Sequence, residues 1–148
     1  MRKSKPYDEE KIALVNRARI KVRFSETDAM GVVWHGNYIK FFEDGREAFG
    51  QEFGLEYLLI YESGFTAPIV DVGCQYKHSL TFGEEVIIET GYVPCAAAKI
   101  QFIYKILRAS DEQIMAQGHT VQVFLNSSKE LELLNPKFYK EWKGRWNL

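Results

Sequence analysis

Asp28 is an acidic residue in a short segment, Phe24 to Asp44, that also contains a histidine and the expected start of a helix. Backbone N–H groups in the first turn of a helix have no partner inside the helix, so they can bind a group that carries negative charge. Amides near Gly36 and Asn37 should therefore point outward and could bind a carbonyl oxygen. A carboxylate beside such amides predicts a catalytic site.

A change of hydrophobic period places this loop between a strand and a helix. Ile20, Val22 and Phe24 alternate with polar residues, which predicts a half-buried strand. After Asn37 the apolar residues follow the i, i+3, i+4 rule instead, which predicts an amphipathic helix with an aromatic face to bury. The residues on that face are Tyr38, Phe41, Phe42, Gly45, Phe49 and Phe53.

The remaining sequence indicates a sheet and a terminal helix. LEYLLIYESG predicts a short second helix that ends near Gly64, and alternating residues from Val70 onward predict about four more strands. Asn135 followed by Pro136 predicts a C-terminal helix. This order favours an α+β fold in which an antiparallel sheet covers one helix. We divide the chain into an N-terminal extension (1–16), one main domain (17–134) and a C-terminal helical segment (135–148).

Composition excludes several classes of protein. The chain has 148 residues, a formal net charge of -1, 46% hydrophobic and 26% charged residues, which indicates neither disorder nor nucleic-acid binding. It shows no secretory signal and no stretch long enough to span a membrane, so we expect a cytoplasmic protein. Cys74 and Cys95 both fall in predicted strands, where reduced, buried thiols are favoured over a disulfide.

Metal and cofactor sites are also not indicated. The histidines at positions 35, 78 and 119 have no CxxC or HExxH partner, so the sequence predicts no metal centre. We expect no cofactor.

The segment TDAMGVVWHGNYIKFFEDGR, from Thr27 to Arg46, resembles the motif of the hot dog fold thioesterases, specifically the acyl-CoA hydrolases similar to 4-hydroxybenzoyl-CoA thioesterase. PIVDVGCQYKHSLTFGEEVIIET also resembles the second and third strands of that family. The resemblance implies a long helix wrapped by a curved antiparallel sheet of about five strands. It also implies homodimers with a continuous sheet, often paired into tetramers, with active sites at the dimer interface. An unpaired sheet edge independently favours dimerisation.

The resemblance assigns catalytic roles to two residues. Asp28 matches the acid that acts either as nucleophile or as general base for water. His35 matches the position whose backbone N–H polarises the thioester carbonyl, and the amides of Gly36 and Asn37 lie beside it. The resemblance therefore predicts an acyl-CoA thioesterase.

Three further residues are expected to contact the substrate. Tyr38 matches an aromatic residue beside the acyl site, and Ser79 lies near a position where some relatives place a hydroxyl. Some relatives hold the CoA phosphates with a basic cluster before the fourth strand, whereas this chain offers only Lys99 there.

The chemistry of thioester hydrolysis suits such a site. A thiolate leaves readily, so a base and an oxyanion site suffice without a metal or a strong general acid. Three alternatives remain: a noncatalytic acyl-thioester binding module, an acyl carrier protein thioesterase, and a dehydratase of the same fold. Asp28 could also merely cap a turn.

Overall fold

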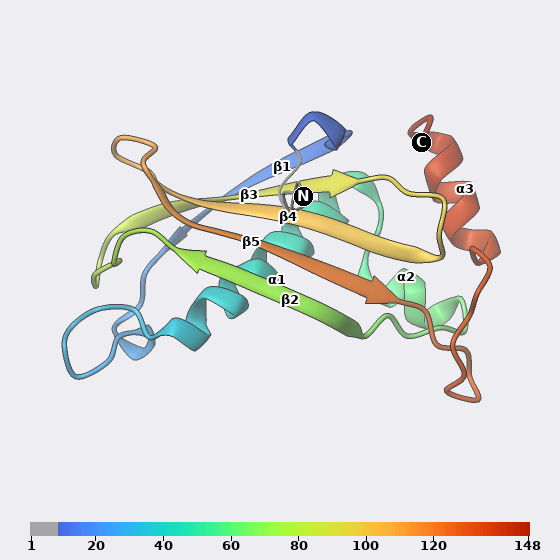
Figure 1. Cartoon of the computed structure of the whole chain (residues 1–148), viewed down its shortest axis with the longest axis horizontal. Coiled ribbons are helices and arrows are strands. Elements are labelled where there is room, and N and C mark those ends of the chain that lie inside the picture. The colour runs from blue at the N-terminus through green and yellow to red at the C-terminus, as the bar shows by residue number, and fades with distance from the viewer. Residues whose placement is uncertain (1–8) are drawn as a thin grey trace, which may run out of the picture.

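The computed structural model describes residues 9–148, which form one curved sheet around a long helix (Figure 1). The elements are β1 (Leu14–Lys21), α1 (His35–Phe53), α2 (Tyr57–Glu62), β2 (Ile69–Tyr76), β3 (Glu85–Val93), β4 (Lys99–Arg108), β5 (Ile114–Val123) and α3 (Lys137–Arg145), with 3₁₀ helices at Glu9–Lys11 and Phe24–Glu26. The five strands are antiparallel and their order across the sheet is β1-β3-β4-β5-β2. The predicted α+β class is confirmed.

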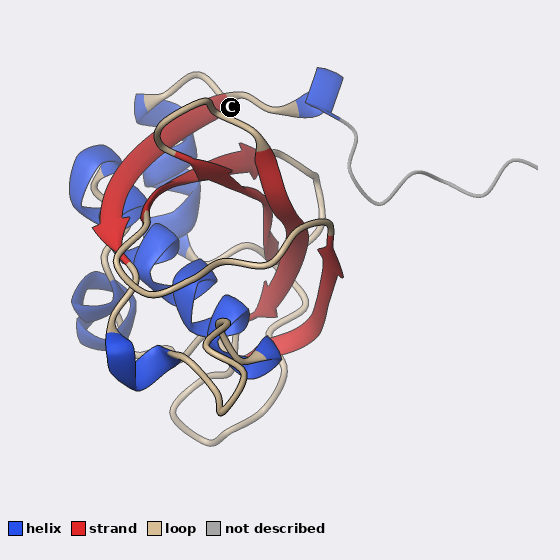
Figure 2. Ribbon diagram, turned by 90° about the vertical axis from the view of Figure 1, so that its left-hand side faces the viewer, coloured by secondary structure: helices blue, strands red, loops and turns tan. Residues whose placement is uncertain are grey.

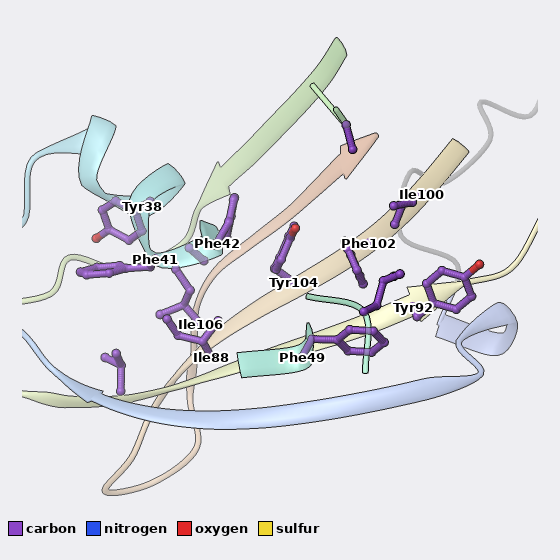
Figure 3. Close-up of a cluster of buried hydrophobic side chains, with 14 of the residues drawn as sticks. Tyr38, Phe41, Phe42, Phe49, Ile88, Tyr92, Ile100, Phe102, Tyr104 and Ile106 are labelled. Atoms are coloured by element: carbon purple, nitrogen blue, oxygen red, sulfur yellow. The ribbon is translucent and has the colours of Figure 1, made fainter. Parts of the chain in front are cut away.

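Helix α1 lies in the hollow of the sheet, which curls around it (Figure 2). The predicted aromatic face points at the strands: Phe41, Phe42 and Phe49 are fully buried, and Figure 3 shows them among side chains of β3 and β4. Phe42 stacks on Tyr104 with ring centroids 4.4 Å apart. Burying one such side chain contributes about 1.5–3 kcal/mol, so this face is what holds the helix in the sheet.

Two glycines allow the close approach between α1 and the sheet. A Cβ atom on Gly45 would lie 2.4 Å from the Oγ1 atom of Thr90, and one on Gly118 would lie 2.1 Å from the Cζ atom of Phe42. Both distances are far shorter than an ordinary van der Waals contact. A larger residue at either position would push the helix away from the strands.

Helix α3 closes the far end of the domain, where α1 ends. The Trp142 side chain is fully buried, and its indole N–H donates to the Phe53 carbonyl oxygen at 2.8 Å. The indole N–H of Trp146 donates to the same oxygen at 3.0 Å. The buried hydroxyls of Tyr92 and Tyr139 lie 2.5 Å apart. The predicted C-terminal helix is thus present and docked on the body.

Two details of the sequence reading were wrong. Strand β1 ends at Lys21 rather than extending through Phe24, because residues 24–26 form a 3₁₀ turn that leaves the Phe24 side chain 75% exposed. Cys95 lies in the connection between β3 and β4, not in a strand, and it is only half-buried, as is Cys74 in β2. Both thiols are free.

The N-terminal boundary falls close to the first strand. Strand β1 begins at Leu14, within the range 1–16 that the sequence assigned to an extension. Residues 1–8 of that range lie outside the described residues.

Candidate active site

Asp28 lies in a tight turn whose hydrogen bonds orient its carboxylate. The Asp28 N–H donates to the Val32 carbonyl oxygen at 2.8 Å, and the Gly31 N–H donates to the Asp28 carbonyl oxygen at 3.0 Å. Oδ1 of Asp28 accepts the Met30 N–H at 2.8 Å, while Oδ2 receives no hydrogen bond from any residue in 9–148. The side chain is half-buried. Capping the turn therefore occupies one carboxylate oxygen and fixes the direction of the other.

Glu26 ties this loop to the start of α1. Its side chain is buried, and Oε1 accepts the Arg23 N–H at 2.7 Å, with Lys40 Nζ 3.4 Å from Oε2. Its carbonyl oxygen accepts the Trp34 N–H at 3.0 Å and the side-chain amide of Asn37 at 2.8 Å. Sequence reasoning missed Glu26, because one polar residue after a strand has no periodic signal. Its main-chain carbonyl oxygen and its buried carboxylate together join the loop to the first turns of α1.

The first turn of α1 offers two free amides instead of the three expected. The Asn37 N–H donates to the Trp34 carbonyl oxygen at 2.9 Å, so it is not available to a substrate. No residue in the described range accepts a hydrogen bond from the N–H of His35 or Gly36. These two amides form the candidate oxyanion site. The side-chain amide of Asn37 links the helix start to Glu26, whereas its backbone N–H does not belong to the oxyanion site.

Trp34 covers the helix start on the outside. A Cβ atom on Gly36 would lie 2.0 Å from Cζ3 of the Trp34 ring, so only glycine leaves room for the indole in this place. Trp34 itself is 58% exposed. This exposed aromatic ring beside Gly36 was not singled out from the sequence, because a single tryptophan in a loop has no periodic signal.

Aromatic side chains line the inner side of the same turn. Tyr38 is buried, and burial raises the pKa of its hydroxyl above the ordinary value. The Tyr76 ring, at the end of β2, meets the His35 ring edge to face at 4.9 Å and the Tyr38 ring at 5.0 Å. The Tyr76 hydroxyl donates to the His35 carbonyl oxygen at 3.0 Å. Tyr76 thus joins the site, although the sequence indicated only a strand residue.

The last two predicted substrate residues lie in different places. Ser79 is exposed and precedes Leu80, whose carbonyl oxygen accepts the Val33 N–H at 2.8 Å, so Ser79 belongs to a segment that runs beside the Asp28 loop. Lys99 begins β4 at the end of the sheet next to α3, where its carbonyl oxygen accepts the Tyr139 hydroxyl at 3.0 Å. One chain therefore does not bring Lys99 to Asp28.

A groove of about 830 Å³ runs between β1 and α1, and its lining includes Phe24 and Glu26 of the 3₁₀ turn but not Asp28. Asp44 lines it, and burial raises the pKa of this carboxyl group, while Lys40 acts in the opposite direction.

Within residues 9–148, no group of three histidine, cysteine or acidic side chains is placed to hold a metal ion. No helix of that range is long and apolar enough to cross a bilayer.

This geometry suits attack on a carbonyl. An oriented carboxylate can attack or activate water, and two unpaired amides at a helix start can stabilise the negative charge that develops on the carbonyl oxygen. Both groups belong to the unit that Glu26 holds together.

Comparison with known proteins places the chain among thioesterases. The model of the Thioesterase-like superfamily matches residues 22–142. A relative from Bacillus subtilis (strain 168), named "Putative acyl-CoA thioesterase YneP", is 31% identical over 129 residues, which cover 86% of this chain and 92% of the relative.

Solved structures of similar proteins share the fold. DHNA-CoA thioesterase from Staphylococcus aureus has a TM-score of 0.81 at 24% identity, with 90% of this chain and 89% of that chain covered. A 1,4-dihydroxy-2-naphthoyl-CoA thioesterase from Synechocystis has a TM-score of 0.79 at 18% identity, with 90% and 98% covered. The long helix in a curved five-stranded antiparallel sheet matches these structures and confirms the hot dog fold expected from the motif. The chain therefore belongs to the thioesterase-like superfamily.

Proposed function

We propose that this protein is an acyl-CoA thioesterase that hydrolyses a thioester to a carboxylic acid and CoA. One observation supports this above all: a single hydrogen-bonded unit holds the Asp28 carboxylate together with the unpaired amides of His35 and Gly36. The family match and the name of the Bacillus relative support the same reaction class.

In this reaction Asp28 serves as the nucleophile or as the base for a water molecule. In the second case Asp28 takes a proton as the water oxygen bonds to the carbonyl carbon, and the electron pair of the C=O bond moves onto oxygen. The amides of His35 and Gly36 stabilise that oxygen. When the C=O bond forms again, the C–S bond breaks and CoA leaves as a thiolate. In the nucleophile route Asp28 displaces the thiolate to form a mixed anhydride, which water then opens. Hydrolysis in ¹⁸O-labelled water under single-turnover conditions detects this route, because an unlabelled second oxygen in the product can come only from Asp28, when water attacks the aspartyl carbon.

We further infer that two copies of the chain complete the site. Strand β2 is an outer strand of the sheet, and Val70 and Val72 on it are 60% and 44% exposed. An exposed, apolar outer strand is a template for pairing, and pairing across a two-fold axis covers it. Tyr76, which contacts the helix start, lies on the same strand.

Light scattering tests this assembly. The chain mass is 17.2 kDa, and we expect a dimer or a dimer of dimers of that unit. Val72→Lys should shift the protein toward monomers because it places a charge on the pairing edge. A wild-type protein that is monomeric at assay concentrations would contradict the shared site.

A substrate panel tests the reaction. We expect turnover of at least one member of a panel of aliphatic and aromatic acyl-CoAs, measured by release of the free thiol. Turnover restricted to acyl carrier protein thioesters would identify the other carrier. Retention of an acyl-CoA without hydrolysis would instead indicate a binding module.

We infer that the protein acts in the cytoplasm, because both cysteines are free and disulfides are rare in that compartment.

A further inference from the structure

The Tyr76 hydroxyl donates to the His35 carbonyl oxygen, and this oxygen belongs to the same peptide group as the Gly36 N–H. The carbonyl oxygen of one residue and the N–H of the next lie on opposite sides of one planar unit with partial double-bond character. A hydrogen bond to the oxygen therefore fixes the orientation of the peptide plane that contains the N–H. It also withdraws electron density from the peptide nitrogen and makes the N–H a stronger donor.

We propose that Tyr76 is a positioning residue of the active site, which orients and strengthens the Gly36 amide through the His35–Gly36 peptide group. This inference rests on the proposed function, because it assigns the Gly36 N–H to the carbonyl oxygen of a thioester. Tyr76 contacts the site only through that peptide group and the neighbouring rings.

The Tyr76 ring is held where this role requires it. The rings of His35 and Tyr38 meet it at interplanar angles of 87° and 89°, so the ring is held at two edge-to-face contacts. Tyr38 is buried and anchored on the inner face of α1. The Tyr76 hydroxyl keeps its proton at neutral pH, as tyrosine ordinarily does, and burial raises its pKa further. The hydroxyl bonds to the His35 carbonyl oxygen at 3.0 Å, and it also interacts with the Cys74 thiol on the same strand, which further raises the Tyr76 pKa.

A purely structural role would have little effect at this position. Tyr76 is 45% exposed at the last position of an outer strand, and phenylalanine would keep both ring contacts. The hydrogen bond to the His35 oxygen would be lost, together with the interaction of the hydroxyl with the Cys74 thiol on the same strand. Removing a whole oxyanion donor costs about 10²-fold to 10³-fold, so weakening one should cost about 3-fold to 10-fold in kcat.

The kinetic test compares Tyr76→Phe with wild type on the best substrate of the acyl-CoA panel. We expect kcat to fall about 3-fold to 10-fold, on the oxyanion magnitude, with KM within about twofold and an unchanged melting temperature. Tyr61→Phe is the matched control, because it makes the same chemical change on a 66% exposed tyrosine of α2. A kcat equal to that of wild type, or an equal loss in the control, would overturn the inference.

A second readout does not depend on activity. In ¹⁵N-labelled protein, the Gly36 nitrogen resonance should move to lower frequency in Tyr76→Phe, since the bond to the preceding carbonyl oxygen is gone. It should not move in Tyr61→Phe. An unchanged Gly36 resonance would contradict the inference even if kcat fell. If wild type hydrolysed no thioester, the proposed function would fail while this measurement still reported on the hydrogen bond.

Discussion

The side-chain amide of Asn37 donates to the main-chain carbonyl oxygen of Glu26 at 2.8 Å, and this bond fastens the Asp28 loop onto the first turn of α1. Without it, Glu26 would be joined to the helix start by the Trp34 N–H, which bonds to the same oxygen at 3.0 Å, and by the ion pair with Lys40 at 3.4 Å. The distance between carboxylate and amides therefore depends on a side chain that itself has no role in the chemistry.

Replacing Asn37 by alanine should harm activity more than stability. The variant loses one hydrogen bond, worth about 0.5–1.5 kcal/mol in the free energy of unfolding. A shift of about 1 Å between reacting groups can cost about 10²-fold, so we expect kcat/KM to fall about 10-fold or more. Urea denaturation and steady-state kinetics measure the two effects. In Gln51→Ala, an exposed polar change on the same helix, the free energy of unfolding should stay within about 0.5 kcal/mol of wild type.

The C-terminal helix should be part of the cooperative fold. Trp142→Ala removes a fully buried indole and its bond to the Phe53 oxygen, which should lower the free energy of unfolding by about 3–5 kcal/mol. Trp146→Ala is the matched control, since that indole bonds to the same oxygen but is 38% exposed, and it should cost clearly less. Equal losses measured by thermal and urea unfolding would show that burial is not what makes α3 important.

Stability should fall in alkaline solution because of the buried tyrosine pair. Burial raises the pKa of Tyr92 to about 12 and also raises that of Tyr139. Between the unfolded pKa near 10 and the folded pKa of about 12, the folded state binds more protons than the unfolded state. The stabilisation is thus fully present below pH of about 10 and is lost as the pH rises through the folded pKa, by about 2–3 kcal/mol for Tyr92.

Tyr92→Phe checks this assignment. We expect the pH midpoint of alkaline unfolding, followed by circular dichroism, to be higher in Tyr92→Phe than in wild type, after correction for the stability change that the substitution causes at neutral pH. The exposed Tyr57→Phe should leave the pH profile as it is in wild type. A wild-type profile in Tyr92→Phe would place the alkaline sensitivity in another group.

The helix and sheet followed from the sequence because each has a long periodic signal. The stripe from Tyr38 to Phe49 could be predicted since burial repeats along one face of α1. Strands β2 and β3 could be predicted from alternating apolar and polar residues in the sequence, although burial along β2 does not alternate. The end of β1 could not be predicted from the sequence. Glu26 accepts the Arg23 N–H and caps a 3₁₀ turn, and this local bond overrides the alternating pattern. Local capping thus decided the boundary.

The site was only partly predictable for a similar reason. Asp28 and the amides of His35 and Gly36 follow from one contiguous motif. Tyr76 comes from a strand distant in the sequence, and its role depends on which way a single hydroxyl points. The backbone N–H of Asn37 donates to the Trp34 carbonyl oxygen, and this bond depends on the geometry of the first helical turn. Such contacts are set by the tertiary arrangement and carry no local signal.

The turnover of Asp28→Asn on the best acyl-CoA substrate, measured beside wild type and His35→Ala, tests the account most directly. Asparagine keeps an oxygen that can accept the Met30 N–H, so folding should be preserved. We expect kcat to fall by about 10²-fold or more in Asp28→Asn, on the general-base magnitude, and by clearly less in His35→Ala, whose backbone N–H remains. Wild-type turnover in Asp28→Asn would contradict the assignment of the chemistry to this carboxylate.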